Sequence, residues 1–474
     1  MATNRRSFIG TAAMAAGGVL SGCATGGEPE AAKAAPSIVR AGADQKIRMG
    51  FIGIGNRGTE VMRQFMNQPD VEVAALCDCY KPYLDRDQAA VDPKFFEYGI
   101  GGAVPKFDKR DQFGPNVKRY SDYRRLLEDK NVDAVMIATP DHQHAIMTID
   151  AIKAGKDVYC EKPLSATIVE GRAMVNAQKA SKQVVAVGLN RRGSDAFRKL
   201  VAEVRTGKYG TFLSGRGARL SNLAPYGIGK CPDCEPPKGF DWDAWLGPRP
   251  YRPYRYTTAP YFFRWHEEFS SQMGNWGVHY CDVMRWILGE EYPCAITAIG
   301  SKCSLDHDGD IPDTIDVLYE FADKKTIHFS IYEGFTARPV FKREVEIAGT
   351  DGVIYAGESG FEIEPQGKRE FKNPKEPKFE KVTYKAQNKM LADGSWGGST
   401  QNVVRDFLDR VKDRGTPLCT LETGHRSTSF ALLGNIAYHM GQRLEWDGVN
   451  ERFTNCEKAN ELLHYKYRDG YRLG

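Results

Sequence analysis

The sequence lacks a strong net charge and lacks a histidine pair at metal-site spacing. Its 474 residues contain 65 lysines and arginines against 61 aspartates and glutamates, which leaves a formal net charge of only +4. Proteins that bind nucleic acid or anionic membranes through charge need a one-signed field that this balance does not supply. The 9 histidines include no pair at the spacing of a metal site, so we expect no metal ion. A small, roughly neutral substrate fits this composition better.

Long apolar runs are also lacking, and the N-terminus instead carries two export-like signals in order. The stretch TNRRSFIG places Arg5 and Arg6 before a mildly apolar run that is too short to span a bilayer, which resembles a twin-arginine export signal. The run ends in LSGC, which resembles a lipobox, in which Cys23 would be acylated. We therefore expect residues 1–22 to be a signal, residues 23–45 a flexible tether, and the protein to reside in the periplasm or cell envelope.

The sequence has 11 cysteines, of which Cys23 belongs to the expected anchor. An oxidising compartment would permit disulfides, but spacing alone does not assign the pairs. The motif CPDC, with Cys231 and Cys234, is a single CxxC in a proline-rich stretch, whereas a structural zinc site needs a second pair of ligands. A local disulfide and a buried pair of thiols are both compatible with this motif.

The strongest local signal is a glycine-rich turn between an apolar strand and an amphipathic helix. The stretch KIRMGFIGIGNRGTEVMRQFM begins with alternating apolar residues and ends with apolar residues at helical spacing. In such a turn Gly53 permits the tight bend, Gly55 lets the backbone approach a pyrophosphate, and Gly58 lets the helix pack closely. The helix N-terminus would present N–H groups to the phosphates, with Asn56 and Arg57 at the start of the helix. The pattern predicts a dinucleotide-binding turn.

The end of the next strand indicates which dinucleotide binds. The stretch VEVAALCD places Asp78 twenty residues after Gly58, where a carboxylate can accept hydrogen bonds from a ribose 2′-hydroxyl. The same charge would repel a 2′-phosphate, so we predict NAD as the cofactor, with NADP disfavoured. Arg57 is the nearby cation that could partly offset the repulsion.

Short apolar strands and amphipathic helices alternate from residue 46 to residue 190. This alternation predicts a Rossmann domain, a doubly wound parallel sheet whose ligands bind at the carboxyl ends of the strands. Polar residues gather at the ends of the later strands, and we expect them to line the cofactor site. For His142 and His144 a purely structural role at a helix start is the equal alternative. The candidate cofactor-binding residues at these strand ends are Thr139, Pro140, His142, His144, Glu161, Lys162, Asn190 and Arg191.

Residues 191–447 have the pattern of a half-buried antiparallel sheet. Stretches such as GTFLSGRGARL, AITAIGSKCSL and DTIDVLYEFA alternate apolar and polar residues with few helices between them, which predicts an α/β domain whose sheet has one covered face. A long loop at about residues 221–265 is rich in proline and aromatic residues. Its rings could stack on a sugar or could pack the loop against the domain or a sister subunit. We expect residues 448–474 to form a C-terminal tail.

Three motifs in order, GFIGIGNRG, IATPDHQH and CEKPL, resemble those of the Gfo/Idh/MocA family, which groups glucose-fructose oxidoreductase, inositol dehydrogenase and their relatives. The resemblance covers about residues 46–447. It implies a nucleotide-binding domain followed by an α/β domain with a large, mostly antiparallel sheet, whose open face often supports homo-oligomers. It also implies that Lys162 touches both the nicotinamide and the substrate. A lysine beside a cationic ring should have a lowered pKa, which suits proton relay.

The stretch NWGVHYCD supplies the remaining candidate catalytic residues. In this family a helix of the second domain carries an aspartate and a histidine four residues apart, which receive the substrate's hydroxyl proton together with the lysine. His279 aligns with that histidine, and Asn275 stands where many members have the aspartate. An amide orients a hydroxyl but does not titrate, so His279 would act as the base, with Asp282 as its partner one turn further on. The candidate catalytic set is therefore Lys162, Asn275, His279 and Asp282.

These observations together predict an NAD-dependent oxidoreductase that acts on the CH–OH group of a sugar, sugar acid or cyclitol. Because an exported enzyme has no soluble NAD pool, we expect the cofactor to be held tightly and regenerated in place. An NAD-dependent glycosidase or lyase that oxidises its sugar transiently is the first alternative, since the family includes such enzymes. A non-catalytic sugar-binding lipoprotein is the second. We expect a small carbohydrate as the partner, with no nucleic acid and no membrane contact except through the lipid anchor.

Overall fold

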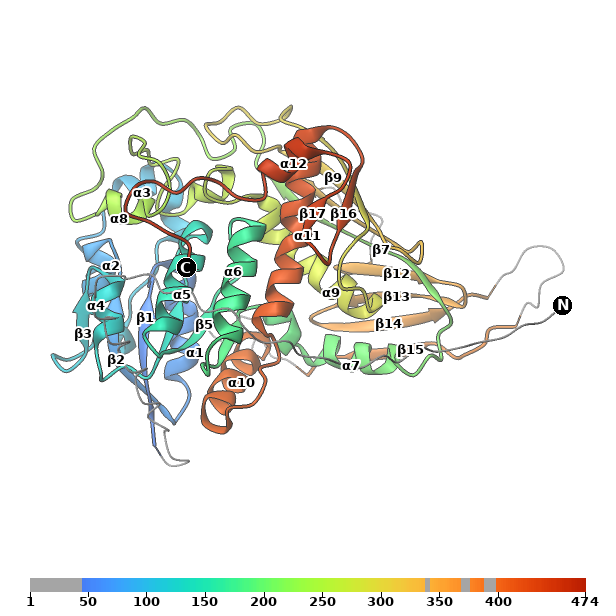
Figure 1. Cartoon of the computed structure of the whole chain (residues 1–474), viewed down its shortest axis with the longest axis horizontal. Helices are drawn as coiled ribbons and strands as arrows, with labels where there is room; N and C mark the ends of the chain where they lie inside the picture. The colour runs from blue at the N-terminus through green and yellow to red at the C-terminus, as the bar shows by residue number, and fades with distance from the viewer. Residues whose placement is uncertain (1–44, 337–341, 368–375, 388–397) are drawn as a thin grey trace, which may run out of the picture. The chain divides into compact units, whose positions relative to one another are not determined.

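Two β-sheets organise the part of the chain that the computed structural model describes, namely residues 45–336, 342–367, 376–387 and 398–474. The expected signal and nearly all of the expected tether lie in residues 1–44, outside the described residues. In Figure 1 the smaller sheet lies on the left and the larger sheet on the right.

The smaller sheet has six parallel strands in the order β3-β2-β1-β4-β5-β6. This is the doubly wound order of nucleotide-binding domains, and the strand order reverses between β1 and β4, where such sheets bind their ligands. Its central strands are fully buried runs, AVMI in β4 and DVYC in β5, as expected when both faces are covered. The strands are β1 (Ile47–Ile52), β2 (Val71–Cys77), β3 (Lys118–Tyr120), β4 (Ala134–Ile137), β5 (Asp157–Cys160) and β6 (Val185–Val187).

Helices follow the strands of this sheet and begin where the sequence supplies a cap. In α6 the Thr167 hydroxyl accepts a hydrogen bond from the Glu170 N–H at 3.2 Å, while the Glu170 carboxylate accepts one from the Thr167 N–H at 3.0 Å. This reciprocal pair satisfies backbone groups that a helix start leaves free. The helices of this domain are α1 (Asn56–Met66), α2 (Lys81–Asp85), α3 (Lys94–Glu97), α4 (Tyr123–Glu128), α5 (Asp141–Lys153) and α6 (Ile168–Lys179).

The core of the smaller sheet is completed by a helix from the other end of the chain. The helix α10 (Ser399–Asp413) places Phe407 in the same apolar cluster as Phe65 of α1 and Tyr159 of β5. The ring centroids of Phe65 and Phe407 lie 6.0 Å apart, edge to face, which is a favourable aromatic geometry. A bidentate ion pair between Arg405 of α10 and Asp70, at 2.7 and 2.9 Å, also joins α10 to the first domain.

The larger sheet has 11 strands, ten of which follow the order β15-β14-β13-β12-β7-β10-β9-β8-β16-β17, while β11 pairs with β7. Of its described strand pairs, β10 with β7 is parallel and the others are antiparallel. The strands are β7 (Phe212–Asn222), β8 (Ala295–Ser301), β9 (Thr314–Glu320), β10 (Thr326–Tyr332), β11 (Gly334–Phe335), β12 (Val345–Gly349), β13 (Gly352–Gly357), β14 (Gly360–Pro365), β15 (Val382–Lys385), β16 (Leu444–Asp447) and β17 (Arg452–Phe453).

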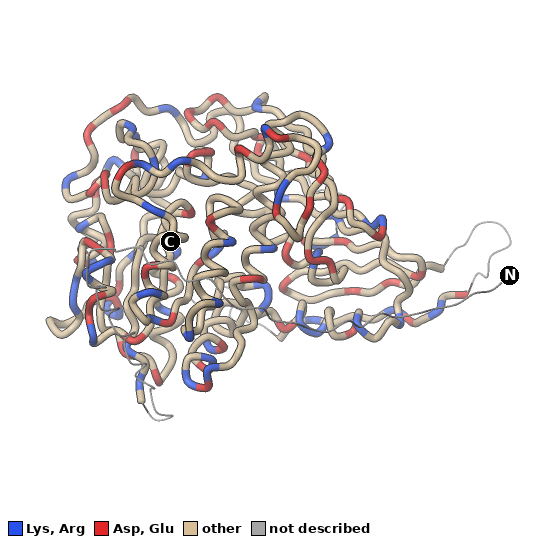
Figure 2. The backbone as a smooth tube through the Cα atoms, in the orientation of Figure 1, with Lys and Arg blue, Asp and Glu red and all other residues tan. Residues whose placement is uncertain are grey.

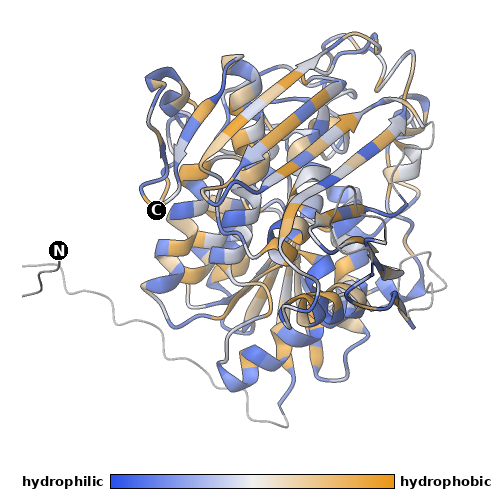
Figure 3. Ribbon diagram, turned by 90° about the vertical axis from the view of Figure 1, so that its right-hand side faces the viewer, coloured by the Kyte–Doolittle hydropathy of each residue, from blue (hydrophilic) through white to orange (hydrophobic). Residues whose placement is uncertain are grey.

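One face of the larger sheet is covered by the helices α7 (Asp195–Val204), α9 (Val278–Leu288) and α11 (Leu421–Met440). Figure 3 shows hydrophobic and hydrophilic residues alternating along its strands. Val317 and Phe329 on the covered face share a buried cluster with Met284 of α9 and Phe430 of α11, whereas Ile299 on the opposite face is 75% exposed. The predicted fold class, a doubly wound parallel sheet followed by a mostly antiparallel one, is confirmed.

The long aromatic loop contains a short helix, α8 (Trp242–Leu246), and lies against the first domain. Trp242, Trp245, Tyr254 and Tyr256 are buried in one cluster with Tyr80. These four rings therefore pack the loop against the first domain, which was one of the two roles considered for them. The expected tail at residues 448–474 carries β17 and α12 (Glu457–Glu461) before its last residues return to the first domain, as Figure 1 shows.

Charge is mixed along the described chain, and Figure 2 shows Lys and Arg interleaved with Asp and Glu. Within the described ranges, no helix combines the length and the apolar character that crossing a bilayer requires. Cys231 and Cys234 are both present as thiols, the first buried and the second half-buried.

Candidate active site

The glycine turn after β1 forms one wall of a crevice. Gly53 has a φ of +77°, a left-handed conformation that side chains disfavour. A Cβ on Gly58 would lie 1.8 Å from the Gly53 carbonyl oxygen, so only glycine lets α1 begin this close to the strand. A Cβ on Gly55 would touch only Tyr83, at an ordinary 3.5 Å, so the backbone here is open to a ligand. No described side chain caps α1, which leaves the N–H groups of its first turn to a phosphate.

Asp78 ends β2 beside this turn and is fixed by it. Its Oδ2 accepts a hydrogen bond from the Ile54 N–H at 2.9 Å, and its Oδ1 accepts one from the Tyr80 N–H at 2.9 Å. Burial raises the pKa of Asp78 to about 6, so the carboxylate is still ionised at neutral pH. Arg86 donates to the Ile54 carbonyl at 2.8 Å and to the Thr59 hydroxyl at 2.9 Å. Nothing in the local sequence pattern marks Arg86 for this position.

Arg57 is engaged at another strand end. Its Nη2 donates to Glu161 at 3.1 Å and its Nη1 donates to Glu60 at 3.2 Å. Burial opposes the charge of Arg57, but Glu161 and other neighbours together outweigh it and raise the pKa of the guanidinium. Because two carboxylates already hold Arg57, it does not offset the charge of Asp78, and this arrangement favours NAD over NADP.

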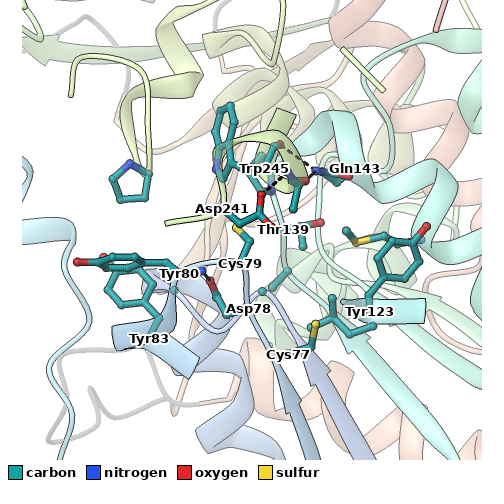
Figure 4. A pocket seen from close by; sticks show the side chains of 18 of the residues that line it. Cys77, Asp78, Cys79, Tyr80, Tyr83, Tyr123, Thr139, Gln143, Asp241 and Trp245 are labelled. Atoms are coloured by element: carbon teal, nitrogen blue, oxygen red, sulfur yellow. Dashed lines mark hydrogen bonds between the residues drawn. The ribbon is translucent and has the colours of Figure 1, made fainter. Parts of the chain in front are cut away.

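A crevice of about 330 Å³ opens above the glycine turn. Figure 4 shows the lining residues Asp78, Cys77 and Tyr123 in the lower part of the view and Asp241 and Trp245 in the upper part. A glycine cradle, an uncapped helix start and a buried carboxylate in one crevice are the groups that a dinucleotide requires. The predicted cofactor residues that line the crevice are Gly53, Gly55, Asn56, Arg57, Asp78, Thr139 and Pro140. Trp245 of the aromatic loop also lines it, as do residues that no sequence pattern marked, including Tyr123, Gln143, Met147, Phe240 and Arg264.

The two histidines after β4 hold loops together and do not line this crevice. The His142 Nε2 lies 2.9 Å from the Trp245 carbonyl, and burial lowers the pKa of His142 to about 3. The two ring nitrogens of His144 face the carbonyls of Pro163 and Thr139 at 2.7 and 2.9 Å. Burial opposes the charged form of His144, but Cys160 and other neighbours raise its pKa to about 9. Between the cofactor-lining role and the structural role considered for these histidines, their contacts fit the structural role.

Lys162 follows Glu161 at the end of β5 and meets the second domain. Its Nζ donates to the Asn275 carbonyl at 2.8 Å and to the Asn275 Oδ1 at 3.2 Å. Burial lowers the pKa of Lys162 to about 8, although the charge of Glu161 acts in the opposite direction. The structure therefore brings together two of the predicted catalytic residues, one from each domain.

His279 lies at the start of α9, directly after a π-helical turn at Met273–Gly277. Its side chain is buried, and its Nδ1 has no hydrogen-bond partner among the described residues. Burial lowers the pKa of His279 well below its usual value, and the charges of Arg191 and Lys162 lower it further. The ring is therefore neutral at pH 7. Trp276 lies beside it, with ring centroids 6.4 Å apart.

Asp282 does not partner His279 and belongs to a different buried network. Its carboxylate accepts three hydrogen bonds from Arg192, two from Nε at 3.0 Å and one from Nη2 at 2.8 Å, and one from the Ser427 hydroxyl at 2.5 Å. A fully buried carboxylate needs such compensation, and Arg192 supplies it. The structure thus places Asp282 in a buried ion-pair network with Arg192 and not beside His279, where it was expected.

The residues after β6 lie near the site but outside the crevice. Arg191 forms an ion pair with Glu344 at 3.0 Å, and its charge acts on His279. The Oδ1 of Asn190 has no partner within the described residues. Arg264, which no sequence pattern marked, lines the crevice with its guanidinium 4.4 Å from the centroid of the Tyr261 ring. Its charge contributes to the lowered pKa of Lys162.

Profiles of one oxidoreductase family match both halves of the chain. The profile described as "Oxidoreductase family, NAD-binding Rossmann fold" matches residues 47–189. The profile described as "Oxidoreductase family, C-terminal alpha/beta domain" matches residues 250–433, and a second C-terminal profile of the family matches residues 395–473. These matches confirm the predicted oxidoreductase class and the predicted NAD cofactor.

Curated relatives match parts of the chain. Inositol 2-dehydrogenase from Salmonella typhimurium (strain LT2) is 27% identical over 248 residues, which are 52% of this chain and 56% of that protein. Glycosyl hydrolase family 109 protein 1 from Shewanella sp. (strain ANA-3) is 32% identical over 180 residues, which are 37% of this chain and 36% of that protein. The chain thus spans about half or less of the length of these relatives.

Solved structures share the fold over most of the chain. Levoglucosan dehydrogenase in complex with NADH and levoglucosan superposes with a TM-score of 0.60 at 20% identity, covering 85% of this chain and 99% of that one. Aldose-aldose oxidoreductase from Caulobacter crescentus, complexed with glycerol, superposes with a TM-score of 0.57 at 16% identity, covering 85% and 100%. Since the profiles of both domains match in the order in which the fold places them, the chain belongs to the Gfo/Idh/MocA family of NAD-binding oxidoreductases.

Proposed function

We propose that the protein oxidises a hydroxyl group of a sugar, sugar acid or cyclitol with NAD. The observation that carries this proposal is the contact of Lys162 with Asn275 beside the neutral His279, next to a crevice built for a dinucleotide. The similarity to inositol 2-dehydrogenase and levoglucosan dehydrogenase supports a polyhydroxylated substrate.

The side chains of the site suit removal of a hydroxyl proton. His279 is neutral at pH 7, so it can accept a hydrogen bond from the substrate hydroxyl and then its proton. Lys162, with its pKa lowered to about 8, can take that proton on in its neutral form and relay it, and the Asn275 amide orients the hydroxyl without titrating. Bound NAD would supply a hydride acceptor, with Gly53, Gly55 and the start of α1 holding its phosphates.

We also propose that the cofactor stays on the protein through successive turnovers. The crevice is walled on its outer side by residues of the second domain, including Phe240 and Trp245. A retained cofactor must be reset in place, either by a second carbonyl substrate or by return of the hydride to the same sugar. Ping-pong kinetics or an absence of net NADH should result.

The proposed location is the periplasm or cell envelope, with a lipid anchor at Cys23. This proposal depends on the sequence motifs at Arg5, Arg6 and Cys23, all outside the described residues. We propose in addition a homo-oligomer formed through the open face of the larger sheet, where Ile299 is 75% exposed and Leu318 is 39% exposed.

The test of the proposed reaction begins with the cofactor. Mass spectrometry of nucleotide released from the native protein should find NAD. Mixing the holoprotein with myo-inositol, levoglucosan, glucose or glucuronic acid should then reduce the bound nicotinamide, which is followed by its absorbance. A protein that purifies without nucleotide and binds none on addition would refute the proposal and favour a non-catalytic sugar-binding lipoprotein.

A second candidate function is an NAD-dependent glycosidase or lyase. Two observations favour it, namely Asn275 where many family members have aspartate, and the similarity to glycosyl hydrolase family 109 proteins. The retained Glu161-Lys162-Pro163 sequence argues against it, because the glycosidase branch of the family generally lacks that motif. Release of the aryl group from aryl glycosides, without net NADH, would identify the glycosidase.

A further inference from the structure

The cofactor crevice has an outer wall that comes from the second domain. We name residues 237–247 the strap. The strap runs against the chain that follows Asp78, where the Lys81 N–H donates to the Gly239 carbonyl at 2.8 Å and the Asp241 N–H donates to the Cys79 carbonyl at 2.8 Å. Asp78 and Asp241 therefore line the crevice from two adjacent segments of the chain, as Figure 4 shows.

The far end of the strap is bound to α5. The Gln143 side-chain amide donates to the carbonyls of Ala244 and Trp245 at 2.8 and 2.9 Å. The rings of Trp242 and Trp245 stack at 4.8 Å, and the Trp242 Nε1 donates to the Arg252 carbonyl at 2.7 Å. With both ends attached, the strap crosses the crevice from the end of β2 to the start of α5.

The C-terminal residues 464–474, which we name the terminal segment, fasten the strap through one side chain. Arg468 donates from Nη1 to the Asp243 carboxylate at 2.6 Å, from Nη2 to the Asp243 carbonyl at 2.8 Å and from Nε to the Gly247 carbonyl at 2.5 Å. Its own N–H donates to the Pro248 carbonyl at 3.0 Å. The Arg468 side chain is only 19% exposed, whereas that of Asp243 is 70% exposed.

The terminal segment is itself held by contacts with both domains. The Tyr467 hydroxyl donates to the Glu170 carboxylate at 2.6 Å, and the Arg249 guanidinium lies 3.3 Å from the centroid of the Tyr465 ring. Tyr471, three residues after Arg468, lines the crevice. The segment thus connects α6, the strap and the crevice wall.

We propose that the strap and the terminal segment are part of the cofactor site, and that Arg468 is a positioning residue that sets how slowly the dinucleotide leaves. The inference rests on the proposed function, in which the cofactor is retained. A dinucleotide under the strap can leave only when the strap lifts, and lifting it separates Arg468 from Asp243 and Gly247. An exposed ion pair alone would contribute little, but Arg468 also satisfies two backbone carbonyls with a mostly buried guanidinium.

The test measures release of NAD from the holoprotein. The protein is diluted into excess isotope-labelled NAD, and native mass spectrometry follows the exchange. For Arg468→Gln we expect release about tenfold faster, equivalent to about 1.4 kcal/mol, because charge-assisted hydrogen bonds are lost. Asp243→Asn should give a smaller increase, about threefold, since the backbone contacts of Arg468 remain. The double variant should match Arg468→Gln, because both changes remove one interaction.

Two controls separate the inference from general destabilisation. Arg472→Gln changes an exposed arginine of the same segment and should leave the release rate as in the wild type. For Arg468→Gln the dissociation constant for NAD added to the nucleotide-free protein should rise while kcat of the NAD-saturated protein stays near the wild-type value, and the melting temperature of the nucleotide-free protein should move by no more than in the control. If Arg468→Gln and Asp243→Asn both release NAD at the wild-type rate, the inference fails while the proposed function stands. If the wild type holds no NAD, the proposed function itself fails.

Discussion

Replacing Lys162 with methionine tests the centre of the proposed chemistry. Methionine keeps an unbranched side chain of similar length but removes the ammonium that donates to Asn275 at 2.8 and 3.2 Å. Proton transfer by a positioned group contributes roughly 10²- to 10⁴-fold to a rate. We therefore expect hydride transfer to slow by about that factor, while the bound cofactor remains, because Lys162 does not line the dinucleotide crevice.

The pH dependence of the same step has a definite sign. The neutral amine is the form of Lys162 that can accept a proton, and burial lowers its pKa to about 8. Sugar oxidation by the wild type should therefore rise with pH up to about 8 and then level off, and reduction in the reverse direction should fall over the same range. In Lys162→Met the rise of the oxidation rate with pH should disappear, since the titrating amine is gone.

Single-turnover kinetics on the holoprotein supply the assay. The protein is mixed with the most rapidly oxidised sugar of the panel, and the absorbance of the reduced nicotinamide is followed from pH 6 to pH 10. Lys153→Gln, which changes an exposed lysine at the end of α5, is the matched control and should behave as the wild type. If Lys162→Met reduces its nicotinamide within about fivefold of the wild-type rate at every pH, the assigned role of Lys162 is wrong.

Three further predictions address the cofactor site and the buried network. Gly58→Ala places a Cβ 1.8 Å from the Gly53 carbonyl, so the variant should lose bound NAD and its melting temperature should fall. Asp78→Ala should weaken NAD binding by about tenfold and reduce the preference for NAD over NADP, as titration calorimetry with both dinucleotides would show. Asp282→Asn should destabilise the fold by about 3–5 kcal/mol in urea unfolding, because Arg192 is left buried without its carboxylate, and an unchanged midpoint would contradict this assignment.

Local pattern was sufficient to predict both sheets, the glycine turn and Asp78. Each of these depends on neighbours within one strand-turn-helix unit, where periodicity and spacing decide the structure. The contact between Lys162 and Asn275 joins residues far apart in the sequence, and it followed from the family resemblance rather than from spacing.

The features that the sequence did not reveal depend on distant partners. Asp282 falls at a plausible helical spacing from His279, but its orientation is decided by Arg192 and Ser427, which lie on other elements. His142 carries no local sign that its ring nitrogen faces the Trp245 carbonyl, about a hundred residues later. The same holds for the aromatic loop, whose rings are buried only because the first domain offers Tyr80 and its neighbours.

The position of α10 has a consequence for how this chain is made. Phe407 of α10 closes an apolar cluster whose other members, such as Phe65 and Tyr159, are synthesised hundreds of residues earlier. During synthesis the nucleotide-binding domain therefore cannot complete its core, and that cluster stays open to water until α10 emerges from the ribosome. A fragment ending at residue 190 would expose the same apolar surface permanently and would be prone to aggregate.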